Sequence, residues 1–142
     1  MNTLTEFQFA AETKRLHNVR ARVRRQLIAW GVPETTVQQT VLAVHEACAN
    51  AIRHGCNNRG AGTVAVHMRH DARMLDIKVC DTGHVPHPDT ADAATAKPFQ
   101  PLASGGLGLR LIRRVFDDVQ ITTNAKQGTC VHMRRYHNGT RV

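Results

Sequence analysis

One short stretch of the chain combines a carboxylate, a carboxamide and an imidazole at regular spacing. In "HEACANAIRHG", residues 45–55, these side chains belong to Glu46, Asn50 and His54, four positions apart each time. On a helix they would form one polar ridge, because each step of four residues rises about 6 Å and rotates by only about 40°. A carboxylate can take up a proton, and a carboxamide oxygen can bind a hard cation such as Mg²⁺. The same spacing is also typical of the water-facing side of an amphipathic helix.

Small residues beside this ridge favour a binding site over a solvated surface. Ala43, Ala47 and Ala49 stand next to it, where an exposed helix usually carries longer polar side chains. Small side chains leave space for a second group to approach the helix. We therefore expect a ligand to lie against this side of it.

A second motif, "CDTG" at residues 80–83, follows an apolar segment. It places Asp81 at the edge of a predicted sheet, and Gly83 allows the backbone to turn closely past a ligand. Taken alone, the motif is more typical of an ordinary turn at the end of a strand.

A third motif, "GGLGLRLI" at residues 105–112, follows a proline-rich segment. Gly105, Gly106 and Gly108 stand at the start of a predicted helix, where free N–H groups and the helix dipole can hold phosphate. A flexible linker is the alternative interpretation. The motif is not a P-loop, because no Lys-Ser or Lys-Thr follows, and no strand immediately precedes it as in a dinucleotide-binding fingerprint.

Hydrophobic periodicity predicts the first elements that position these motifs. Alternation predicts a strand over residues 4–9, and spacings of three and four predict helices over 12–30 and 33–54, the second ended by Gly55. The side of the second helix that faces the core should hold Val37, Val41, Val44, Cys48 and Ala51.

The second half of the chain is predicted to contain a hairpin, a loop, a helix and two strands. The hairpin lies between residues 63 and 80 and leads directly into Asp81. Residues 84–104 hold four prolines and little periodicity, so we expect a long loop that acts as a lid, and residues 136–142 should form a flexible tail. The inner face of the hairpin should hold Val64, Val66, Met68, Leu75, Ile77 and Val79.

Composition limits the classes of protein that the chain can belong to. With 142 residues, 42% of them hydrophobic, residues 1–142 should form a single domain. A formal charge of +8 predicts attraction to acidic partners. Only 4% of residues are aromatic and no nucleic-acid-binding motif is present, so direct binding to nucleic acid is not expected.

Cysteines and apolar runs indicate where the protein works. Cys48, Cys56, Cys80 and Cys130 lack zinc-site spacing and stand in mostly apolar surroundings, so we expect buried, reduced thiols. The sequence shows no signal peptide and no apolar run of about 18 residues. The expectation is a cytoplasmic protein without a membrane anchor.

The first predicted helix carries much of the positive charge. A solvated face is the usual explanation of such a charge run, and a surface that docks an acidic partner is the alternative. The candidate partner-binding residues are Lys14, Arg15, Arg20 and Arg24.

The order and separation of the three motifs are more specific than any one of them. "ExxxNAxxHG" on a helix, "DxG" after a hairpin, a loop, "GGLGL" entering a helix and "GT" opening a strand resemble the Bergerat-fold (GHKL) ATPases from Phe7 to Arg135. Within that superfamily the chain is most similar to the anti-sigma-factor serine/threonine kinases of partner-switching pathways. The resemblance implies a two-layer α/β sandwich, with helices on one face of a mostly antiparallel sheet and ATP held under the lid.

The resemblance also implies a role for each motif. Asn50 would bind Mg²⁺, Asp81 would accept a hydrogen bond from the adenine amino group, and Glu46 would be the general base that activates a serine hydroxyl. One position departs from the family pattern, because Val85 stands where a second glycine is common after "DxG". The remaining nucleotide-binding positions implied by the resemblance are His54, Gly83, Gly105, Gly106, Leu107, Gly108 and Thr129.

Two functions follow from this comparison. The first is an ATP- and Mg²⁺-dependent anti-sigma factor, acting as a homodimer, that binds a sigma factor and phosphorylates an antagonist protein of the STAS type on serine. The second is a sequestering module that binds ATP and transfers little or no phosphate. The intact Glu46 favours the first function, and Val85 favours the second.

Overall fold

Five strands form one antiparallel sheet in the order β1-β2-β3-β5-β4. The computed structural model describes residues 3–55, 62–81, 102–124 and 128–137. In chain order the elements are β1 (Thr3–Ala10), a 3₁₀ turn η1 (Thr13–Arg15), α1 (Leu16–Ala29), α2 (Glu34–Asn50), a π-helical turn η2 (Ala51–Gly55), β2 (Thr63–His70), β3 (Met74–Asp81), α4 (Leu102–Val115), β4 (Asp118–Asn124) and β5 (Gly128–Tyr136).

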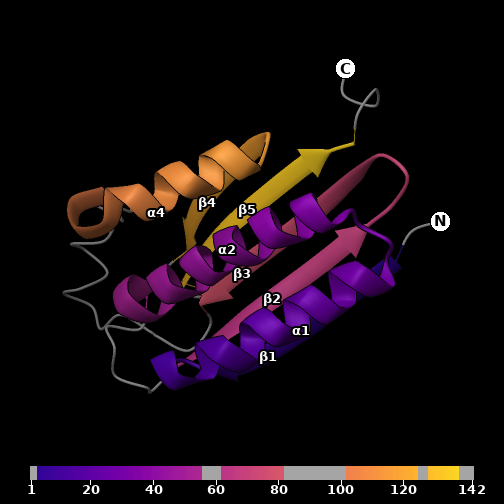
Figure 1. The fold of residues 1–142 in the computed structure, drawn as a ribbon. Coiled ribbons are helices and arrows are strands. Elements are labelled where there is room, and N and C mark those ends of the chain that lie inside the picture. Colours follow the sequence, from indigo (N-terminus) through magenta and orange to yellow (C-terminus); the bar gives the residue numbers. More distant parts are fainter. Residues whose placement is uncertain (1–2, 56–61, 82–101, 125–127, 138–142) are drawn as a thin grey trace.

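Within the described residues, the helices α1, α2 and α4 lie on one face of the sheet, so the fold has two layers (Figure 1). The core lies between the layers, because the apolar side of each helix and the inward-facing residues of the strands are buried there. This arrangement confirms the predicted α/β sandwich. None of the helices in the described parts of the chain is long and apolar enough to cross a membrane.

The predicted hairpin is confirmed as β2 and β3, which pair antiparallel with Val66 opposite Val79. Alternation along both strands follows from the two-residue period of a pleated strand, which turns every second side chain to the same face. All six residues predicted for the inner face are buried.

The predicted helix over residues 33–54 is α2 continued by η2. The α-helix begins at Glu34 instead of Pro33, whose ψ of 147° is extended. The last five residues, through Gly55, have π-helical hydrogen bonding. π-helical turns occur mostly as single turns and are frequent at functional sites. The hydrophobic periodicity could not predict this change. It indicates which face of a helix is apolar, but it does not indicate which carbonyl oxygen each amide bonds to.

Two boundaries in the second half of the chain differ from the prediction. The loop predicted over residues 84–104 ends earlier, since α4 begins at Leu102; residues 82–101 lie outside the described residues. Tyr136 and His137 do not belong to the tail predicted over residues 136–142, and residues 138–142 lie outside the described residues. Tyr136 is the last residue of β5 and its amide N donates to Asp117, and the amide N of His137 donates to the carbonyl oxygen of Arg73 at 2.9 Å.

The prediction that all four cysteines are reduced is wrong for two of them. Cys80 on β3 and Cys130 on β5 stand opposite each other in the strand register and form a disulfide. The sequence could not indicate this pair, because the two residues are 50 positions apart and meet only through the register of β3 on β5. Cys48 is a free, buried thiol as predicted, and Cys56 lies outside the described residues.

Candidate functional site

Four elements meet at one end of the molecule. Figure 1 shows the C-terminal end of α2, the end of β3, the start of α4 and the start of β5 at the same end of the fold. The turn η2 contacts both β3 and β5. The fold therefore brings the three sequence motifs, separated by up to about 60 residues, to one end of the sheet, as a common ligand site requires.

Asn50 is the last residue of α2 and is buried, with 3% of its surface exposed. The ridge that carries it therefore does not simply face water, which was the alternative that the spacing left open. Its side-chain oxygen Oδ1 accepts a hydrogen bond from Arg53 Nη2 at 2.8 Å. A carboxamide oxygen is a hard ligand of the type that Mg²⁺ takes, and in this structure it is occupied by the guanidinium donor of Arg53.

Arg53 is a residue of this site that the sequence analysis missed. It stands three positions after Asn50, and residues at this spacing lie on the same side of a helix. The signal was therefore present in the sequence as an arginine inside "NAIRHG". An arginine is not typical of a residue that binds a metal ion or accepts a proton, so the motif did not predict a cation at this site.

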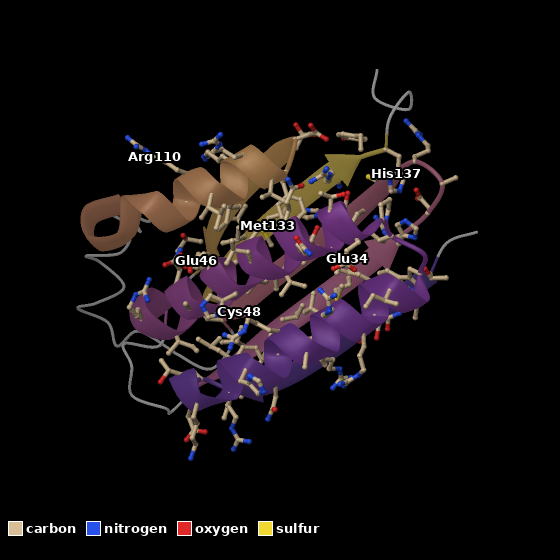
Figure 2. The ribbon with its side chains drawn as sticks, in the orientation of Figure 1. Glu34, Glu46, Cys48, Arg110, Met133 and His137 are labelled. Atoms are coloured by element: carbon tan, nitrogen blue, oxygen red, sulfur yellow. A yellow bond between two sulfur atoms is a disulfide. The ribbon has the colours of Figure 1, made fainter. Side chains whose placement is uncertain are left out.

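Glu46 lies in the C-terminal half of α2 (Figure 2) and is half-buried, with 28% of its side chain exposed. Its carboxylate oxygen Oε2 is 3.8 Å from Nε2 of its neighbour His45. On the other side of the ring, Nδ1 of His45 is 3.0 Å from Nη1 of Arg20, which comes from α1. Burial and the nearby guanidinium of Arg20 lower the pKa of His45, with a smaller effect in the same direction from Arg53 and an opposing effect from Glu46.

Asp81 is buried at the end of β3, with 2% of its surface exposed. Its Oδ2 accepts a hydrogen bond from the backbone N–H of Thr129 at 3.0 Å. The structure thus brings together Asp81 and Thr129, as the resemblance implied, through the amide of Thr129. A buried carboxylate with oriented partners is suited to recognising a base edge by hydrogen bonding.

Gly128 packs directly against Asp81. Its φ of +81° lies in the left-handed region, and a Cβ atom at this position would overlap both the side chain and the carbonyl oxygen of Asp81. Only glycine therefore fits here without moving Asp81. Gly128 is the glycine of the "GT" motif, and the motif alone predicts no role for it.

The glycine cluster lies inside α4 and not before it. Gly105, Gly106, Leu107 and Gly108 are its fourth to seventh residues, so Gly106, Leu107 and Gly108 lie beyond the first four amides, which have no partner within a helix. The prediction that the glycines stand at the free start of the helix is therefore wrong for Gly106 and Gly108. The backbone of His54 lies in η2. Gly83 and Val85 lie outside the described residues.

Three of the four predicted partner-binding cations have partners within the chain. Arg15 pairs with Glu12 at 3.0 Å and Arg24 with Glu34 at 2.8 Å, and Arg20 contacts His45 as described above. Lys14 is exposed. The basic side of α1 is thus partly neutralised by its own neighbours.

A second group of cations lies on α4. Arg110, Arg113 and Arg114 are exposed, and within the described part of the chain none of them forms an ion pair or side-chain hydrogen bond. Figure 2 shows the side chain of Arg110 extending outward from α4.

Comparison with known proteins agrees with this geometry. A model of the histidine kinase-like ATPase domain matches residues 9–135. The serine-protein kinase RsbW of Bacillus velezensis is 29% identical over 142 residues, which cover 96% of this chain and 88% of that protein. The anti-sigma F factor of Bacillus licheniformis is 32% identical over 107 residues, covering 72% of this chain and 70% of that protein.

A solved structure shares the fold. The crystal structure of the RsbU and RsbW domains of a Mycobacterium tuberculosis protein superposes with a TM-score of 0.64 at 20% sequence identity, over 98% of this chain. The chain spans about a third of that protein, 34% of its length. The matched family, the full-length relatives and the shared fold together confirm the resemblance that the motifs indicated. The chain therefore belongs to the histidine kinase-like ATPase domain family, in the branch that includes the RsbW serine-protein kinases and the anti-sigma F factors.

Proposed function

We propose that the protein is an anti-sigma factor with ATP-dependent serine kinase activity. One observation carries this proposal. A buried carboxamide, Asn50 on α2, and a buried carboxylate, Asp81 at the end of β3, lie at the same end of the fold. The first suits the metal and phosphate end of a nucleotide, and the second suits the adenine end. Both stand in the motifs that the family membership would require.

Each residue has a physical task in this proposal. Asn50 holds Mg²⁺ through its side-chain oxygen, and bound Mg²⁺ neutralises the charge on the phosphates of ATP. The free amides of the first turn of α4, which begins at Leu102, face the phosphates. Glu46 accepts the proton of the incoming serine hydroxyl, and its partly exposed position on α2 leaves it accessible to a protein substrate.

The name anti-sigma F factor supports a sigma-factor partner, and the remaining parts of the proposal are what the family resemblance implies. We propose that the chain binds a sigma factor, and that a STAS-type antagonist is the protein that it phosphorylates. We further propose that it acts as a homodimer in the cytoplasm. The exposed cations on α1 and α4 would speed encounter with acidic partners, an effect that salt screens over about 8 Å.

The test is a phosphoryl-transfer assay. The purified protein is incubated with γ-labelled ATP, Mg²⁺ and a candidate STAS-type antagonist, with wild type compared against Glu46→Gln. We expect serine labelling of the antagonist by wild type and a fall in its rate of at least about 100-fold in the variant, the usual contribution of a general base.

Calorimetric titration with ATP and Mg²⁺ provides the control for folding and binding. Glu46→Gln should bind ATP as wild type does, because the substitution removes one charge and keeps the shape. ATP binding without labelling by either protein would support the alternative, a sequestering module. The absence of any ATP binding by wild type would overturn both functions.

A further inference from the structure

We infer that His45 is a positioning residue for Glu46 and that Arg20 of α1 orders it, so that the basic face of α1 is coupled to the general base. This inference rests on the proposed function, since it assigns Glu46 the role of base. The sequence motifs assign no role to His45 or Arg20. His45 directly precedes Glu46 on α2, and the packing of α1 against α2 brings Arg20 to it.

The contact between Arg20 and His45 fixes the tautomer of the imidazole. A guanidinium has N–H donors and no acceptor, so His45 Nδ1, 3.0 Å from Arg20 Nη1, must be the acceptor. Nδ1 then carries no proton. In the neutral ring the proton is on Nε2, the nitrogen on the opposite edge.

That second nitrogen faces Glu46. His45 Nε2 is 3.8 Å from Glu46 Oε2, and only 23% of the His45 side chain and 28% of the Glu46 side chain are exposed. The N–H group therefore lies near a half-buried carboxylate, at a distance that must shorten before a hydrogen bond forms. It favours the rotamer of Glu46 that keeps the carboxylate beside the ring.

The surroundings of His45 keep the ring neutral. The charged groups around it are Arg20 from α1, Glu46 from α2 and Arg53 from η2, and the net effect of burial and these charges lowers its pKa. A neutral ring with one N–H can serve Arg20 and Glu46 at the same time. A doubly protonated ring could not accept from Arg20.

The consequence is a connection from the surface to the active site. Arg20 was predicted to bind partners, and it belongs to the basic side of α1. An acidic partner that captures its guanidinium would release Nδ1 of His45, and the ring would be free to change tautomer or rotate away from Glu46. Binding at α1 would thereby lower the rate of phosphoryl transfer without touching the nucleotide.

Nuclear magnetic resonance tests the ordering directly. Long-range ¹H–¹⁵N correlation spectra distinguish protonated from unprotonated ring nitrogens, and His45→Gln identifies the signals of His45 among the nine histidines. We expect an unprotonated Nδ1 and a protonated Nε2 in the free protein, and a mixture of tautomers in Arg20→Met. A protonated Nδ1 in wild type would overturn the inference, whether or not the protein is a kinase.

Kinetics test the coupling to Glu46. We expect His45→Ala and Arg20→Met each to lower kcat for antagonist phosphorylation about fivefold, the effect of about one hydrogen bond, with KM for ATP unchanged. His45→Gln should restore most of the rate, because its amide supplies an N–H donor near the position of Nε2. Arg25→Met, an exposed arginine on the same helix, is the matched control for charge and should behave as wild type.

The double variant decides whether Arg20 acts through His45. If it does, Arg20→Met combined with His45→Ala should be no slower than His45→Ala alone, because coupled residues give non-additive losses. Multiplied losses, or a loss in KM and not in kcat, would overturn the coupling. A wild-type protein that binds ATP but phosphorylates nothing would instead overturn the proposed function, and the tautomer measurement would still decide the order of Arg20 and His45.

Discussion

Arg53 donates a hydrogen bond from Nη2 to the side-chain oxygen of Asn50 over 2.8 Å. In this structure the guanidinium thus engages the oxygen that we propose as the magnesium ligand. A cation that approaches Asn50 must share this oxygen with Arg53 or replace it, and two positive charges at one oxygen repel each other. If Asn50 binds Mg²⁺ as proposed, Arg53 therefore competes with the metal.

Replacing Arg53 by methionine removes this competition. We expect the Mg²⁺ concentration that half-saturates ATP binding to fall about fivefold, the equivalent of one ordinary hydrogen bond. Calorimetric titration of ATP at a series of Mg²⁺ concentrations measures the change. Arg25→Met removes the same charge from α1 and should leave the dependence unchanged; equal behaviour of the two variants would contradict the competition.

Gly128 and Gly31 form a matched pair for testing the approach of the backbone to Asp81. Both have positive φ, +81° and +78°, but a Cβ atom would overlap Asp81 at Gly128 and would meet nothing within 4 Å at Gly31. Gly31→Ala should lower the free energy of unfolding by about 1–2 kcal/mol, the cost of a left-handed alanine, and leave ATP binding intact. Gly128→Ala has the same cost and must also displace Asp81.

We therefore expect Gly128→Ala to weaken ATP binding by at least about tenfold, which is about 1.4 kcal/mol. Thermal unfolding and calorimetry on the two variants provide the measurements. If both variants bound ATP as wild type does, Asp81 would not need its present position, and its role at the adenine would be wrong.

Substitutions of Asp81 and Thr129 can distinguish the role of the Thr129 backbone N–H from that of the Thr129 hydroxyl at the proposed adenine site. Asp81→Asn places an amide N–H where a carboxylate now accepts from the Thr129 backbone, so we expect ATP binding to weaken about tenfold or more. Thr129→Val keeps that backbone donor and removes only the hydroxyl. A loss of no more than a few-fold in Thr129→Val, measured in the same titration, would show that the amide and not the hydroxyl orders Asp81; a larger loss would assign the main role to the hydroxyl.

Cys48 should make stability depend on pH above neutrality. Burial on α2 raises the pKa of its thiol from 9.0 to about 12, so the folded protein holds this proton more tightly than the unfolded chain. The contribution is fully present below pH 9.0 and is lost as the pH rises from about 9 towards 12. Cys48→Ala lacks it.

The stability of wild type should thus fall more steeply than that of Cys48→Ala, by up to about 1.4 kcal/mol per pH unit in this range. Urea unfolding of both proteins at several values between pH 8 and pH 10.5 isolates the difference, because all other titrating groups are shared. Parallel curves would mean that Cys48 is accessible to water in the folded state. Reaction of native Cys48 with iodoacetamide would mean the same.

The elements of this fold could be predicted because buried apolar residues recur at a regular spacing along each strand and helix. Val64, Val66 and Met68 alternate on one strand, and Val37, Val44 and Cys48 recur on one side of a helix, so their faces follow from geometry that each residue carries locally. Asn50 and Asp81 could likewise be selected, because each belongs to a short motif of recognisable spacing.

The remaining features depend on contacts between segments that are distant in sequence. The disulfide needs the register of β3 on β5, the close approach of Gly128 needs the position of Asp81, and the contact of Arg20 with His45 needs the packing of α1 on α2. The hydrophobic periodicity of a single segment does not indicate which distant segment it will contact. Arg53 is the exception, since its spacing from Asn50 was visible in the sequence and only its role was not.

The Cys80–Cys130 bridge has a further mechanical consequence. Cys80 immediately precedes Asp81, and Cys130 immediately follows Thr129. The disulfide therefore lies one residue away from both partners of the hydrogen bond between Thr129 and Asp81. While the disulfide is intact, β3 and β5 cannot splay apart there. If a nucleotide binds here as proposed, we expect the movements that admit and release it to occur in elements other than β3 and β5.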